Sequence, residues 1–429
     1  MTTRRSATQP LPRSLDPLHD ESLVGYVLRL AYRTGSTPAE ITVRTGLRRT
    51  ELSGLSLRPL HDLDPGQLHT FCTATSLTPT EARSLLLSDV ASRYGPLDPS
   101  LAKGRTAQAL IAGNAWASFR NTRYCAECLS GSGTEIEQLL GGAWRKLWRI
   151  PAVFSCRLHQ RLLSTRCSGC GQPAQVSKPG HAILHLTVEG LHPLQCRNNI
   201  APKGTRTSTP CGARYNLPDL PSGHPPDAQT LDAVLRLQDR IETLLTTAPG
   251  DAAATFGWRT PIGIYFFDLW ALSSLIFLTW PECRPLTATP TLAEIMDEEV
   301  DQRRQNPPPH RGHGQRSRTR VYTIPPESSL ASAAVLGIAE RLLGAPDEET
   351  AYEALKGVIE RSNRAGSRLG YRFRNTRQAS VPFRATLRHD QRPWAAHQLP
   401  SRADLILKHP GMTRVTPPTA DGSTTRQLA

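Results

Sequence analysis

The sequence predicts a mainly α-helical protein that is interrupted by a small, irregular, cysteine-rich module. Apolar residues recur at helical spacing in the first 120 residues and again beyond residue 227, whereas seven of the nine cysteines fall between Cys125 and Cys211. The 429 residues also include 36 prolines and 31 glycines, which interrupt regular structure. A chain of this length and composition predicts roughly two or three compact units joined by linkers.

The N-terminal segment carries start signals for short helices. An apolar stripe runs from Leu23 to Leu30, behind a capping residue at Asp20 or Ser22. The segments 37–40 and 78–81 both read Thr-Pro-x-Glu, which is a capping box with proline at the first helical position. We therefore expect several short helices in this region.

Short helices joined by tight turns are typical of a helix-turn-helix unit, with residues 38–45 as its second helix. In that arrangement three arginines are available to DNA phosphates: Arg44, Arg48 and Arg49. The alternative is a short helical bundle that binds no DNA, and the pattern alone leaves both open.

The C-terminal half predicts a helical bundle. Residues 231–245 carry an amphipathic stripe, and residues 328–343 and 347–363 predict two further helices. The apolar segment 262–280 contains Asp268 and several small polar residues, so it predicts a buried helix rather than a membrane span.

Seven cysteines and one histidine form a metal-binding pattern. A pair separated by two residues aims both side chains at one ion, and zinc prefers four soft or borderline donors in a tetrahedron. Three such pairs occur, followed by two single cysteines: Cys125 and Cys128, Cys156 and His159, Cys167 and Cys170, then Cys196 and Cys211. We assign a first zinc ion to Cys125, Cys128, Cys156 and His159, and a second to Cys167, Cys170, Cys196 and Cys211.

Both ligand sets are closed, with no open position for a reactive water, so we expect two structural zinc ions and loops that fold only with metal. The alternative, buried thiols without a ligand, does not explain the spacing. Cys72 and Cys283 stand alone near apolar neighbours and are expected in the core. One of His181, His185 and His192 could replace a ligand, although a surface or core histidine is the simpler interpretation.

These features divide the chain into seven segments. We expect a flexible N-terminus (1–15), an N-terminal helical domain (16–120), a tandem zinc-finger module (121–216), a helical domain (227–305), a basic Pro-rich linker (306–327), C-terminal helices (328–375) and a basic, disordered tail (376–429).

The chain is basic, with 51 Lys and Arg against 37 Asp and Glu and a formal net charge of +14. Such an excess favours polyanions through counterion release, although basic tails can also serve only to keep a protein soluble. The N-terminus lacks an apolar signal region, so we expect a reducing, cytoplasmic compartment and no membrane contact. The module adds further candidates for phosphate contact: Arg157, Arg161, Arg166, Arg197, Lys203 and Arg206.

Arginine is dense near the C-terminus. From Arg361 through Arg392, nine arginines face a single acidic residue, Asp390. Tyr371 and Phe373 alternate with two of them, so the aromatic rings could stack on exposed bases while the guanidinium groups bind phosphates. The two arginines are Arg372 and Arg374. The alternative is a short strand or a solvated tail.

We expect no catalytic activity. The carboxylates of segment 297–301 lie on one helix and point in different directions, unlike the converging carboxylates of a two-metal nuclease. The sequence contains neither a Gly-x-x-x-x-Gly-Lys-Ser/Thr phosphate loop nor a His-Glu-x-x-His zinc-protease helix.

The motifs together resemble those of one family. Residues 17–31, Pro-Leu-His-Asp-Glu-Ser-Leu-Val-Gly-Tyr-Val-Leu-Arg-Leu-Ala, are similar to the start of TniQ-type transposition proteins. The succession Tyr-Cys-x-x-Cys-Leu, Trp148, Phe-Ser-Cys-x-x-His and Leu-Leu-x-x-Cys-x-x-Cys-Gly is also similar. The combination is specific, even though each part alone is not.

This resemblance implies a zinc-containing, non-catalytic adaptor for transposon target selection. It implies contact with target DNA or a target-recognising nucleoprotein complex, and recruitment of an AAA+ ATPase that positions the transposase. Whether the chain forms a homodimer stays open. Carried over by position, the ligands are the eight residues assigned above. Residues 197–210 separate Cys196 from Cys211, whereas the family's last pair is closely spaced, so His192 is the nearest substitute for Cys196.

Two other interpretations remain. A zinc-containing helix-turn-helix transcriptional regulator would use the N-terminal helices to read a fixed operator, and an unrecognised nuclease would cut DNA. Each class predicts a different assay result.

Overall fold

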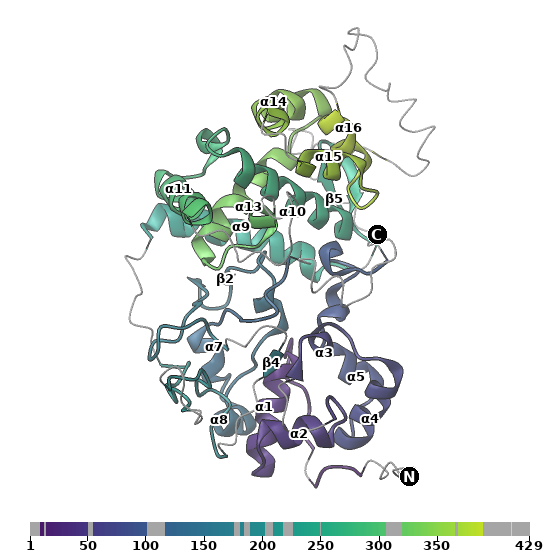
Figure 1. Cartoon of the computed structure of the whole chain (residues 1–429), viewed down its shortest axis with the longest axis vertical. Helices are drawn as coiled ribbons and strands as arrows, with labels where there is room; N and C mark the ends of the chain where they lie inside the picture. Colours follow the sequence, from purple (N-terminus) through teal and green to yellow (C-terminus); the bar gives the residue numbers. More distant parts are fainter. Residues whose placement is uncertain are drawn as a thin grey trace, which may run out of the picture.

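The structure, a computed structural model, describes residues 9–12, 14–49, 55–100, 116–175, 181–183, 189–201, 209–217, 226–248, 250–305, 320–364, 368–388 and 413. It is mostly helical, as the sequence predicts, and its described strands form two-stranded pairs. The N-terminal helices and the cysteine-rich loops lie towards one end of the molecule, and the helices after residue 226 lie at the other (Figure 1).

The N-terminal unit follows its predicted caps. The Ser22 side chain accepts a hydrogen bond from the Gly25 N–H at the start of α1 (Leu23–Thr34), and Gly35 ends that helix with a φ of 64°. Both predicted capping boxes are present, and they start α2 (Pro38–Arg44) and α5 (Pro79–Ser84). The other elements are β1 (Leu55–Ser56), α3 (Arg58–His61), α4 (Pro65–Thr75) and the 3-10 helices η1 (Leu87–Val90) and η2 (Gly95–Leu97).

The cysteine-rich segment contains only short elements among its described residues. They are α7 (Ala126–Ser130), α8 (Glu135–Leu140), the 3-10 helix η3 (Lys146–Arg149), β2 (Ser155–Cys156), β3 (Arg161–Leu162) and β4 (His181–Ile183). β2 and β3 form an antiparallel hairpin, whereas β4 pairs antiparallel with β1 of the N-terminal unit. Buried residues of the two regions belong to one continuous core.

The C-terminal unit begins with α9 (Ala228–Thr246) and the hairpin of β5 (Ala252–Thr255) and β6 (Trp258–Pro261). The chain then continues through α10 (Ile262–Thr279), the 3-10 helix η4 (Arg284–Leu286), α11 (Pro290–Gln305) and α12 (Arg320–Thr323). It ends in α13 (Ser329–Leu343), α14 (Glu348–Arg364), α15 (Arg368–Asn375) and α16 (Val381–Arg388).

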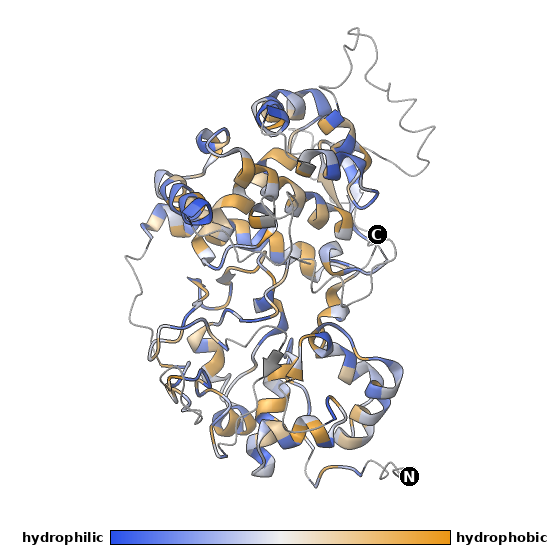
Figure 2. Cartoon of the chain, in the orientation of Figure 1, coloured by the Kyte–Doolittle hydropathy of each residue, from blue (hydrophilic) through white to orange (hydrophobic). Residues whose placement is uncertain are grey.

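Helix α10 is the centre of this unit. It packs against α13, α12 and α14, and the Phe266 ring lies 5.3 Å from the Tyr94 ring of the N-terminal unit. Within the described part of the chain it is the one helix long and apolar enough to cross a membrane, yet 89% of it is buried inside the protein. The prediction of a buried helix is therefore confirmed, and Figure 2 shows apolar residues concentrated along it.

The structure corrects two predicted segments. Part of the expected linker is helix α12, and residues 381–388 of the expected disordered tail are helix α16. Helices α15 and α16 are held by packing, because Phe373 and Phe383 are fully buried and lie against the rings of Trp270 and Phe256. Residues 306–319, 389–412 and 414–429 of these segments lie outside the described residues.

A buried guanidinium joins the cysteine-rich loops to the C-terminal helices. Arg123 donates hydrogen bonds to the carbonyl oxygens of Pro151 (3.1 Å) and Val153 (3.0 Å) on its own side. On the other side it donates to the Pro326 carbonyl (3.1 Å) and the Ser332 hydroxyl (2.6 Å). Burial lowers the pKa of Arg123 to about 10.

A buried amide makes a second connection at the same junction. The Gln238 side-chain oxygen on α9 accepts hydrogen bonds from the backbone N–H groups of Phe154 (2.7 Å) and Ser155 (3.0 Å). The Ser329 hydroxyl at the start of α13 donates to the Leu163 carbonyl (2.7 Å). The β2–β3 hairpin is thus held by α9 and α13.

We predict that Arg123→Ala lowers the free energy of unfolding by about 3 kcal/mol or more, because several buried acceptors lose their donor and each costs about 1–3 kcal/mol. Chemical denaturation of the full chain measures the change. Arg236→Ala is the control, since Arg236 is exposed on α9 and pairs with Asp232 in the same helix. Equal stability of the two variants would show that the Arg123 contacts contribute little.

A buried carboxylate holds the start of α16 to α10. Asp268 accepts a hydrogen bond from the Ser380 N–H at 2.9 Å, and its other oxygen lies 3.5 Å from the Thr255 hydroxyl. Burial raises the pKa of Asp268 to about 7. The folded state therefore binds a proton at this group more tightly than the unfolded state.

We predict that the melting temperature of the wild type, measured relative to Asp268→Asn, falls as the pH rises from about 5 to about 8. The asparagine keeps an acceptor for Ser380 but carries no charge, so the difference isolates the Asp268 titration. A difference that stays constant over this range would contradict the prediction. Asp268→Ala should be less stable than Asp268→Asn at each pH, because the Ser380 N–H loses its acceptor.

Candidate metal centre

The first cluster gathers donors from a short helix and a hairpin. Cys125 and Cys128 flank the first turn of α7, while Cys156 ends β2 and His159 lies in the β2–β3 turn. Gln160 in that turn has a φ of 47°, which helps a short hairpin turn back on itself. The local folding of two separate segments thus brings four side chains together.

The donor atoms of the first cluster lie within van der Waals reach of one another. His159 Nδ1 lies 3.4 Å from Cys125 Sγ, 3.3 Å from Cys128 Sγ and 3.4 Å from Cys156 Sγ. Cys128 Sγ and Cys156 Sγ are 3.5 Å apart. All four donors could therefore contact one metal ion, and Nδ1 is the ring nitrogen that would do so.

The second cluster gathers four cysteines from two loops. Cys167 and Cys170 lie in one turn. In the other loop, the Cys196 N–H donates to the Ala213 carbonyl, which holds Cys196 beside the segment that carries Cys211. Cys167 Sγ lies 3.9 Å from Cys211 Sγ, and Cys170 Sγ lies 3.9 Å from Cys196 Sγ. The four donor atoms all lie within 4.8 Å of one another.

The structure places Cys196, and not His192, in this cluster. The His192 ring uses both nitrogens elsewhere: Nε2 is 3.1 Å from the Leu139 carbonyl, and Nδ1 accepts from the Leu194 N–H at 3.2 Å. Burial lowers the pKa of His192, which keeps the ring neutral. His185 lies outside the described residues, and of His181 only the backbone is described.

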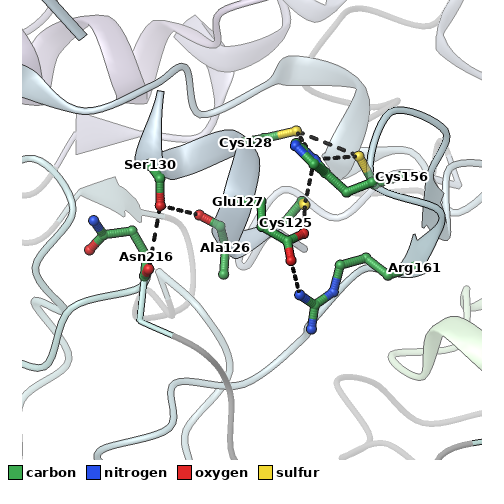
Figure 3. A network of polar contacts seen from close by, with 9 residues as sticks. Cys125, Ala126, Glu127, Cys128, Ser130, Cys156, Arg161 and Asn216 are labelled. Atoms are coloured by element: carbon green, nitrogen blue, oxygen red, sulfur yellow. Dashed lines mark hydrogen bonds and ion pairs between the residues drawn. The ribbon is translucent and has the colours of Figure 1, made fainter. Parts of the chain in front are cut away.

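Polar neighbours surround the sulfur atoms. The Asn198 side-chain N–H groups donate to Cys170 Sγ at 3.6 Å and to the Pro173 carbonyl at 3.0 Å. In the first cluster, Glu127 lies 3.7 Å from Cys125 Sγ and pairs with Arg161 at 2.6 Å (Figure 3). Neither Asn198 nor Glu127 belongs to a metal-binding pattern in the sequence, and their positions two residues after Cys196 and Cys125 are the only signal there.

Burial raises the pKa of the Cys196 and Cys211 thiols. A thiol with a raised pKa keeps its proton at neutral pH, whereas a metal ligand must be a thiolate. Metal binding here would therefore release protons and strengthen as the pH rises. Cys72 and Cys283 belong to neither cluster. Cys283 is buried as predicted, whereas Cys72 is half-buried and packs at the edge of the core.

The predicted phosphate contacts have different surroundings. Arg44 and Arg49 are exposed, whereas Arg48 is half-buried. Within the module, Arg157 pairs with Asp239 at 2.6 Å, and Arg161 pairs with Glu127. Lys203 and Arg206 lie outside the described residues.

Arg197 is part of the module's interior. Its guanidinium donates to the carbonyl oxygens of Leu191 (2.7 Å), His192 (3.2 Å) and Gln195 (3.3 Å), and burial lowers its pKa to about 10. These bonds hold the loop that carries Cys196. The expectation that Arg197 meets phosphates is therefore not supported by its position, since its donors face backbone carbonyls.

Near the C-terminus, the alternation of aromatic residues and arginines falls on helix α15 rather than on a strand. Phe373 is fully buried, so it cannot stack on a base, and the Arg374 guanidinium lies 5.0 Å from the centre of the Tyr371 ring. Arg372 is exposed and Arg374 is largely buried.

Comparison with known proteins finds a related family for the first part of the chain. Neither the curated proteins nor the solved structures contain a match to the chain. Residues 12–163 match the TniQ family, a span that includes the N-terminal helices and the whole first cluster, while the second cluster follows it. The opening motif and the first two cysteine and histidine pairs carried the same resemblance in the sequence. Over residues 12–163, this chain is similar to the TniQ family.

Proposed function

We propose that this chain is a non-catalytic, zinc-containing adaptor in DNA transposition. The TniQ domain supports a transposition-associated adaptor role, and it is the observation that carries the proposal. The adaptor would bind target DNA or a target-recognising nucleoprotein complex. It would recruit an AAA+ ATPase, which in turn positions the transposase.

The two clusters fit zinc. Seven thiolates and one imidazole are soft or borderline donors, which zinc prefers over oxygen-binding cations such as magnesium. A tetrahedral zinc ion with Zn–S bonds of about 2.3 Å would hold two sulfur ligands about 3.8 Å apart. The sulfur separations of 3.5 Å in the first cluster and 3.9 Å in the second are close to that spacing. Four protein donors to each ion support a structural role for both.

We predict that the purified chain contains two equivalents of zinc, and that Cys125→Ser and Cys167→Ser each lose one and lower the melting temperature. The short loops have little core of their own, so the lost ligand should unfold the loops around its ion. Elemental analysis measures the metal, and thermal denaturation measures the stability.

Two variants serve as controls for this experiment. Cys72→Ser removes a cysteine that lies outside both clusters, and His192→Ala removes the alternative fourth ligand. Both should retain two zinc ions. Two ions in both Cys125→Ser and Cys167→Ser, or one ion in His192→Ala, would show that the ligand assignment is wrong.

The N-terminal helices support contact with DNA in this proposal. α1 and α2 pack against each other across the three-residue connection 35–37, an arrangement compatible with a helix-turn-helix. Arg44 at the end of α2 and Arg49 just beyond it are exposed. The same arrangement also favours the alternative function, a zinc-containing transcriptional regulator.

We predict that the full chain forms a complex with an AAA+ ATPase of a transposition system when ATP is present, because an adaptor must bind that partner whether or not it binds DNA strongly. Co-elution in size-exclusion chromatography measures the complex, and the Cys125→Ser variant tests its dependence on the first cluster. Failure to bind the ATPase, together with tight binding of one short duplex over bulk DNA, would instead support the regulator. Cleavage of the duplex would support a nuclease.

A further inference from the structure

Helices α15 and α16 carry an unusual concentration of positive charge. Between Arg368 and Arg388 the sequence contains six arginines and neither aspartate nor glutamate. The two helices pack against each other and against α14. They lie at the end of the molecule opposite to α2 and α4 (Figure 1).

Helices α15 and α16, with the connection 376–380 between them, form a helical hairpin. The hairpin is rigid, because its apolar residues belong to the core. Phe373 of α15 lies against Trp270 of α10, and Phe383 of α16 stacks on Phe256. Asp268 holds the N-terminus of α16 through its bond to Ser380. The backbone positions that carry these arginines are therefore fixed relative to one another.

Three arginines of the hairpin gather on one side. Arg384 and Arg388 are one turn apart on α16 and so share a face of that helix. Arg388 donates a hydrogen bond to the Asn375 side-chain oxygen at 3.2 Å, which brings its guanidinium beside the segment that carries Arg377. We name Arg377, Arg384 and Arg388 the arginine cluster.

The charges of the arginine cluster repel one another. Burial lowers the pKa of Arg384, and the positive charges of Arg388 and Arg377 lower it further. Asp268 is the carboxylate that opposes this effect, but its oxygens are occupied by Ser380 and Thr255. An anion on the outside of the hairpin would relieve this repulsion.

Several other arginines of the same unit pair with carboxylates. On α14, Arg361 pairs with Glu282 at 2.8 Å and Arg364 lies 3.9 Å from Glu360. Arg240 pairs with Glu340 at 2.9 Å. In contrast, no ion pair joins a member of the arginine cluster to another residue in the described ranges. Asp390 follows two residues after Arg388 and lies outside those ranges.

We propose that the arginine cluster, on α16 and the connection that precedes it, is a binding site for the phosphate backbone of double-stranded DNA, separate from residues 12–163. Guanidinium groups bind phosphates in two-point contacts and carry no sequence preference of their own. A duplex is favoured over a single strand because stacking would need free aromatic rings. Of the two candidate rings, Phe373 is buried, and Tyr371 is 61% exposed but has the Arg374 guanidinium over one of its faces, so no series of stacking rings is present in the described part of the hairpin.

This inference rests on the part of the proposed function in which the chain binds DNA. It adds a second DNA contact at the end of the molecule opposite to the N-terminal helices (Figure 1). Such a contact would hold the backbone without reading bases, while the TniQ domain selects the target or its complex. Its failure would leave ATPase binding and metal content unchanged, so the two proposals can fail separately.

The test compares two double variants of the full chain in binding to a short fluorescent duplex of mixed sequence. We expect Arg377→Gln with Arg388→Gln to weaken binding for every sequence tried. We also expect it to reduce the slope of log affinity against log salt by roughly 2, since each lost phosphate contact removes about 0.9. Fluorescence anisotropy at several salt concentrations measures both quantities. The single variants Arg377→Gln and Arg388→Gln should each lower the slope by about 1, so they test the proposal even if the double variant is unstable.

The matched control is Arg361→Gln with Arg364→Gln on α14, which removes the same charge from the same unit. We expect it to keep the wild-type slope, because those arginines are paired with glutamates. An unchanged slope in the Arg377 and Arg388 variants would overturn the proposal, and so would an equal loss in the control. A loss confined to the single-stranded form of the same probe would overturn the assignment to duplex DNA.

Discussion

The arrangement of the whole molecule depends on one buried charge. The Arg123 guanidinium is enclosed between the cysteine-rich loops and the start of α13, where its partners among the described residues are carbonyl and hydroxyl oxygens rather than carboxylates. A buried cation without such acceptors would be very costly. The loops before Cys156 and the segment before α13 must therefore stay together. Because Cys125 is two residues from Arg123, the position of the first cluster relative to the C-terminal helices is fixed by the same group.

The cysteine-rich loops contain little regular structure that could hold them in place. The β2–β3 hairpin has two residues in each strand, and the loops of the second cluster are joined by isolated backbone bridges. Side chains supply the missing order. Arg197 ties its loop through three carbonyl oxygens, Asn198 links that loop to Cys170, and the donor clusters draw separate segments together.

The first cluster lies within the segment that is similar to the TniQ family, while the second begins just after it. Both rest on the same core, in which Trp144 contacts the rings of Tyr124 and Tyr215 from the two parts of the module. The module is therefore one packed body with two donor clusters. In the proposed adaptor it would be a stiff platform between a target-binding end and the C-terminal helices. Some arginines of those helices are paired with carboxylates and others are not.

The sequence by itself determined the features that depend on short-range spacing. The capping boxes at Thr37 and Thr78, the paired donors from Cys125 to Cys170 and the TniQ resemblance could all be predicted, because each is written within a few neighbouring residues. The grouping of the donors into two sets of four also followed from their order along the chain. The buried character of α10 followed from its composition.

Only the tertiary structure decided how distant segments use their polar groups. It placed Cys196 rather than His192 beside Cys170, turned Arg197 inwards, buried Phe373 and extended the helices past residue 376. Each of these outcomes depends on a partner far away in the sequence, as Ser380 depends on Asp268 and Arg123 on Ser332. Local patterns cannot specify such pairs, because a polar side chain finds its partner only after the apolar core has brought the two segments together.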